Sequence, residues 1–180
     1  MDTLLFTERS LWTMFHGMAL GGGALMGLAI ALFSLRAMRC SGVPGATADS
    51  QALHLTWLIV ATAALLWASV LTGTYVTFPA YRAVPPAGVA DLGPYPKALI
   101  QSAPGTAWLH SFAMEAKEHV PWIAAMLATA VAFVGLRYRT KLLGDRPLND
   151  MATVLVAICF ALVSFVALLG VLVNKVAPVE

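Results

Sequence analysis

Four long apolar stretches dominate the pattern of hydrophobic and polar positions along this chain, and charged or helix-breaking residues separate them. A transmembrane helix needs about 20 mostly apolar residues. The stretches that reach this length are residues 13–35, 54–78, 111–136 and 151–173. We therefore expect an all-α fold, a four-helix transmembrane bundle, which forms a single integral membrane domain over residues 1–180.

The composition agrees with this pattern and excludes several classes of protein. Of the 180 residues, 59% are hydrophobic and only 11% are charged, whereas about 25% are charged in a typical soluble domain. The net charge of +2 and the absence of a basic run argue against nucleic-acid binding. No C-x-x-C-H motif occurs, which argues against covalent attachment of a c-type haem.

The basic residues predict the orientation of the bundle. The two short loops on one side and their flanking positions hold six of them: Arg36, Arg39, Arg137, Arg139, Lys141 and Arg146. The side with the termini holds five: Arg9, Arg82, Lys97, Lys117 and Lys175. Because short loops rich in Lys and Arg stay in the cytoplasm, we expect both termini to be periplasmic, in a bacterial inner (cytoplasmic) membrane.

The connection between the second and third spans, residues 79–110, is the longest loop, and the same rule makes it non-cytoplasmic. Its prolines and glycines forbid a long helix, although a short interfacial helix fits near residues 96–102. We expect this loop to be the surface on which a periplasmic redox protein docks, for example a c-type cytochrome.

His16 lies about one turn inside the first apolar stretch, where an ionisable side chain is costly and therefore a functional candidate. At 100° per residue it shares a helix face with Gly23 and Gly27. A face without side chains would let a flat macrocycle lie against the backbone. The alternative is that the two glycines serve close helix packing.

The third stretch opens with the densest group of polar side chains in the sequence, and it includes a second histidine at a depth comparable to that of His16. Glu115 and His119 are four residues apart and share a helix face, and Glu118 lies beside them. Pro121 leaves two possibilities open, since it either kinks a longer helix or begins the membrane helix near residue 119.

The first interpretation of these residues is one non-covalent b-type haem with His16 and His119 as its axial ligands. Glu115 would support a ligand. Arg82, Lys117 or Lys175 would compensate the haem propionates. Tyr75, with Thr72 and Thr74, approaches the same depth from the second span and could bond to a cofactor or to a quinone headgroup.

Three further interpretations stay open. One is a non-haem metal site with Glu115, Glu118 or His110 as alternative ligands. Another is a quinone-binding membrane protein. The third is a cofactor-free accessory subunit of a membrane complex, in which the charged residues tie the loop to the bundle and the helices only pack.

His16 with its following glycines, together with His119, makes the chain similar to the four-helix membrane cytochromes b that anchor redox complexes. The resemblance covers the whole chain as an architecture. It implies an electron-transfer subunit that works with other membrane subunits rather than as a self-contained enzyme. Two-haem members need a second pair of histidines, and the cytoplasmic side of this chain offers only His54.

Overall fold

The computed structural model describes residues 7–41 and 46–178, and in these residues every regular element is a helix. The first span combines α1 (Glu8–Met14), the π-helix η1 (Phe15–Gly22) and α2 (Gly23–Ser41). The second combines α3 (Ala46–Thr72), the π-helix η2 (Gly73–Thr77) and α4 (Phe78–Tyr81). The third combines the π-helix η3 (Leu109–Met114) and α6 (Glu115–Tyr138), and the fourth is α8 (Arg146–Val176).

Four of these helical segments are long and apolar enough to cross a membrane, as the sequence predicted. They are Glu8–Met38, Asp49–Tyr81, Leu109–Tyr138 and Arg146–Val176. Each extends two to five residues beyond the predicted span at either end, because the flanking polar residues continue the helix. The side of the membrane on which each loop lies stays a prediction.

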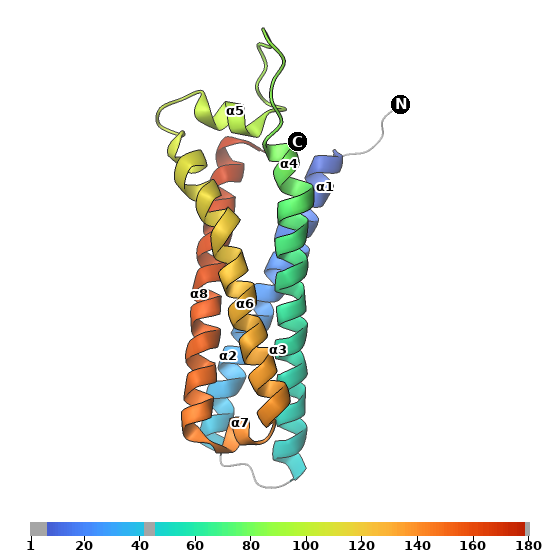
Figure 1. The fold of residues 1–180 in the computed structure, drawn as a ribbon, viewed down its shortest axis with the longest axis vertical. Coiled ribbons are helices and arrows are strands. Elements are labelled where there is room, and N and C mark those ends of the chain that lie inside the picture. Colours follow the sequence, from blue (N-terminus) through green and yellow to red (C-terminus); the bar gives the residue numbers. More distant parts are fainter. Residues whose placement is uncertain (1–6, 42–45, 179–180) are drawn as a thin grey trace.

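Two short helices lie at opposite ends of the elongated bundle (Figure 1). α5 (Pro96–Gln101) lies at the end where α1 begins and α8 ends, and α7 (Lys141–Gly144) lies at the other. α5 confirms the short helix expected near residues 96–102. We call the two halves of the bundle the α5 half and the α7 half.

The helix containing Pro121 settles one alternative that the sequence left open. Pro121 lies inside α6, six residues after its start, so it does not begin the membrane helix. Proline has no amide hydrogen, and the carbonyl four residues earlier, that of Lys117, therefore lacks its usual partner.

The apolar side chains form two separate clusters rather than one continuous core. The larger cluster draws on α2, α3, α6, α7 and α8 and runs from Leu142 near the α7 end to Val70. The smaller cluster lies in the α5 half and includes Tyr81, Ile100, Leu109 and Leu169, with no residue from the first span. The buried apolar side chains of the first span thus contribute to the larger cluster and not to the smaller one.

Glycines allow the first and second spans to approach closely in the larger cluster. A Cβ on Gly27 would overlap the side chain of Thr62, and one on Gly23 would contact Leu65 at 3.5 Å. These glycines therefore serve helix packing, which is the alternative to the flat cofactor surface. Gly23, Gly27 and His16 lie on one side of the first span, as predicted, and this side contacts the second span.

Candidate functional site

A group of half-buried polar side chains lies where the two apolar clusters meet. We call this group the polar layer and define it as His16 of η1, Ser69 and Thr72 of α3, and Lys117 of α6. Leu66 and Val70 belong to the larger apolar cluster, and Leu169 of the neighbouring α8 belongs to the smaller one. Polar groups at this position are costly in a membrane protein unless they have partners.

His16 is half-buried and turns its imidazole toward the second span. Its Nδ1 lies 3.3 Å from Ser69 Oγ and 3.4 Å from Thr72 Oγ1. The Thr72 hydroxyl donates to the Ala68 carbonyl at 2.8 Å, and the Ser69 hydroxyl is 3.4 Å from the His16 carbonyl. With the Thr72 hydroxyl hydrogen directed to a carbonyl, the Thr72 oxygen can accept from Nδ1–H, whereas the Ser69 hydroxyl lies within reach of both Nδ1 and the His16 carbonyl.

This network is compatible with the tautomer of His16 that carries its hydrogen on Nδ1. A neutral imidazole carries one hydrogen, and with that hydrogen on Nδ1 the other nitrogen, Nε2, keeps a free lone pair. Within the described residues Nε2 has no hydrogen-bond partner. It can therefore accept a hydrogen bond or bind a metal ion.

Gly73 makes room for this imidazole at the start of η2. A Cβ built on Gly73 would lie 2.7 Å from Cε1 of His16 and 3.3 Å from Nε2. Any side chain at residue 73 would therefore displace the ring from the hydroxyl groups of Ser69 and Thr72.

Lys117 brings a positive charge to the same layer. Lys117 is half-buried, and its charge acts on His16. Nζ is 3.4 Å from the point where a Cβ on Gly170 of α8 would be, so the absence of a side chain there leaves space for the ammonium. No hydrogen bond or ion pair compensates Lys117 in the part of the chain that the structure describes.

His119, two residues further along α6, lies on the opposite face of that helix. Residues two apart on an α-helix are separated by about 200°, and with Lys117 directed inward His119 is exposed. Its Nδ1 lies 2.9 Å from the Glu115 carbonyl of its own helix. The structure therefore does not bring the imidazoles of His16 and His119 together, and a haem held by this pair does not fit the observed rotation of α6.

The three π-helices share one feature: all lie in the α5 half, in three different spans (Figure 1). η1 contains His16, η2 begins at Gly73 beside it, and η3 directly precedes α6, which carries Lys117. A π-helix turns less per residue than an α-helix, so it changes the direction of the side chains that follow. Such segments occur frequently at functional sites.

The remaining predicted site residues lie outside the polar layer. Tyr75 is 69% exposed, and Glu115 is also exposed. Arg82 lies over the ring of Phe78, with its Cζ 5.0 Å from the ring centroid, at the α5 end. The structure thus places none of these three residues next to His16.

The alternative metal ligands belong to a separate group near the α5 end. The Tyr81 hydroxyl lies 3.0 Å from His110 Nδ1, and the charge of Glu118 acts on Tyr81. Among residues 7–41 and 46–178, no three histidine, cysteine or acidic side chains form a group that could hold a metal ion. This group ties the second span to the start of the third.

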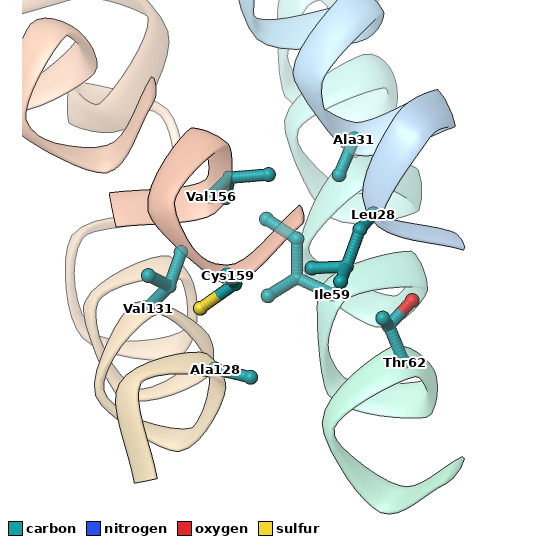
Figure 2. A pocket seen from close by; sticks show the side chains of 8 residues that line it. All are labelled: Leu28, Ala31, Ile59, Thr62, Ala128, Val131, Val156 and Cys159. Carbon is teal, nitrogen blue, oxygen red and sulfur yellow. The ribbon is translucent and has the colours of Figure 1, made fainter. Parts of the chain in front are cut away.

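The larger apolar cluster encloses a cavity of about 10 Å³, the space of roughly one water-sized sphere. Figure 2 shows its lining, with Cys159 and Val156 of α8 opposite Ile59 and Thr62 of α3. The Thr62 hydroxyl is already bonded to the Leu58 carbonyl at 2.7 Å. An apolar cavity of this size offers no polar path through the α7 half.

Sequence reasoning missed one residue of the polar layer, Ser69, because a serine within an apolar stretch carries no signal of its own. It named Lys117 only as a possible partner of haem propionates. The signal for Lys117 was its place eight residues after the start of the third helical segment, a depth at which a lysine needs a partner.

Comparisons with protein-family models, curated proteins and solved structures found no match to this chain.

Proposed function

We propose that this chain is an electron-transfer subunit of a larger membrane redox assembly and that its polar layer binds the headgroup of a quinol. The observation that carries the proposal is the His16 imidazole, held at Nδ1 by two hydroxyl groups, in the same layer as Lys117, for which the described residues provide no hydrogen bond or ion pair. The orientation proposed from the basic residues puts this site on the periplasmic side of a bacterial cytoplasmic membrane.

The hydrogen-bonding groups of the layer match those of a quinol. One ring hydroxyl would donate to Nε2 of His16, which is held in place because Ser69 and Thr72 fix Nδ1–H. The other ring oxygen is an acceptor for the ammonium of Lys117. His16 could then hold a proton taken from the bound headgroup. The long apolar tail of a quinol suits a site between membrane helices.

Little of the chain lies outside the helices, so the proposal includes partner subunits that supply the rest of the redox path. The most apolar span, Arg146–Val176, is also the least covered, with 17% of its most apolar window buried. Its open side can contact lipid or another membrane subunit. The connection 79–110, which contains α5, remains the proposed docking surface for a periplasmic redox protein, of which a c-type cytochrome is one example.

One observation also favours a second candidate, a b-type haem with His16 as one axial ligand. Ligating histidines usually donate the hydrogen of their other nitrogen to a neighbouring acceptor. Nδ1 of His16 lies 3.3 Å from the Ser69 hydroxyl oxygen and 3.4 Å from that of Thr72, and either oxygen could be such an acceptor. A second ligand would have to come from outside the pair predicted from the sequence, since His119 faces away.

Purified protein tests both candidates at once. Organic extraction should recover a bound quinone from the wild type, and His16→Ala should lose it. His119→Ala is the matched control. Because His119 is exposed, this variant should retain the quinone. Haem absorbance bands that disappear in His16→Ala would favour the second candidate. A colourless wild type without quinone, unchanged by either substitution, would favour the cofactor-free accessory subunit and contradict the proposal.

A further inference from the structure

Lys117 is an interior cation without a compensating charge, and this suggests the chemical class of the ligand. Of the two acidic residues on the same turns, Glu115 is exposed, and the charge of Glu118 acts on Tyr81 of the second span. The described groups near Lys117 include the imidazole of His16 and the position without a side chain at Gly170. Charges at such depth are normally paired with one another or with a ligand.

Two helices determine the position of the Lys117 ammonium. α6 places Lys117 toward the bundle interior, and Gly170 of α8 leaves space at its tip, where a Cβ would be 3.4 Å from Nζ. The backbone contributes a further polar atom, because Pro121 leaves the Lys117 carbonyl without its helical partner. An ammonium that only needed to reach water could extend toward the α5 end instead.

We propose that Lys117 pairs with a negatively charged ring oxygen of the bound headgroup, so that the site prefers the anionic form of its quinone-type ligand over the neutral form. This inference rests on the quinol-binding function proposed above and specifies the charge state that the site selects. Lys117 would act directly on the ligand, whereas Ser69 and Thr72 would act through His16.

Two alkylated naphthoquinones of the same tail length provide the test. The first carries a 2-hydroxyl group that ionises near neutral pH and stands in for the anionic headgroup, and the second carries a 2-methyl group and stays neutral. Binding to the full chain in detergent is measured by titration calorimetry. The wild type should bind the ionised compound about 10 to 100 times more tightly, as expected for a charge-assisted hydrogen bond.

Lys117→Gln should remove this preference, while binding of the neutral compound should change little. Lys175→Gln is the matched control, because Lys175 is exposed at the end of α8. Equal affinity of the wild type for the two compounds, unchanged by Lys117→Gln, would overturn the inference and leave quinone binding intact. Failure of both compounds to bind would contradict the proposed function itself, and the inference with it.

A second variant separates ligand pairing from a structural role. Lys117→Met removes the charge and keeps a long apolar side chain, and burying an uncompensated charge is unfavourable. The ligand-free variant should therefore unfold at a temperature no lower than the wild type. A clear loss of thermal stability would show that the ammonium is already compensated inside the protein, and this would overturn the inference.

Discussion

The interior of the bundle is packed differently in the α7 half and in the α5 half. In the α7 half, glycine and small residues bring the spans together and leave a cavity of only about 10 Å³. In the α5 half, π-helices interrupt three spans, and a histidine, two hydroxyl groups and a lysine occupy the interior. Glycine therefore has two different roles in this chain. Gly27 allows two helices to pack closely, and Gly73 leaves space for the imidazole of His16.

The largest expected effect is on the packed half. Gly27→Leu would overlap Thr62 of the second span, and overpacking of a tight core typically costs about 1–3 kcal/mol. We expect a lower free energy of unfolding, measured by titration with a denaturing detergent and followed by circular dichroism. Gly17→Leu is the control, because nothing lies within 4 Å of a Cβ at Gly17. Equal stability of the two variants would mean that the first two spans are not closely packed at Gly27.

The second prediction concerns the polar half and separates binding from stability. Gly73→Ala would displace the His16 ring, since the new Cβ would lie 2.7 Å from Cε1. We expect the affinity for the neutral naphthoquinone to fall about tenfold, which corresponds to about 1.4 kcal/mol. Helix propensity favours alanine over glycine, so the free energy of unfolding should fall less than in Gly27→Leu. Gly17→Ala should leave the affinity unchanged, and an equal loss in this control would remove the special role of Gly73.

The smallest expected effect is at the α5 end, outside the polar layer. Tyr81→Phe removes the hydroxyl that lies 3.0 Å from His110 Nδ1, and such a bond typically contributes about 0.5–1.5 kcal/mol. We expect a small loss of stability and no change in ligand affinity. Tyr75→Phe is the control, because Tyr75 is 69% exposed. A large loss of ligand affinity in Tyr81→Phe would mean that the binding site reaches the α5 end. The distinction between the polar layer and the α5 end would then not hold.

Much of the fold could be predicted from the sequence, and part of the candidate site could not. The common face of His16, Gly23 and Gly27 followed from helical spacing and is present in the structure. The pairing of His16 with His119 did not follow, because it required a particular rotation of the third span. The rotation observed exposes His119 and turns Lys117 inward.

The sequence by itself determined that this chain has four helices long and apolar enough to span a membrane, since the thickness of the hydrocarbon layer sets the length of apolar run that is needed. Only the tertiary structure decided which side chains of those helices meet. A membrane helix is apolar on nearly every face, so hydrophobic periodicity specifies its rotation weakly. The π-helical segments change that rotation further, and packing against the neighbouring spans then determines whether a polar side chain faces the bundle interior or its outer surface.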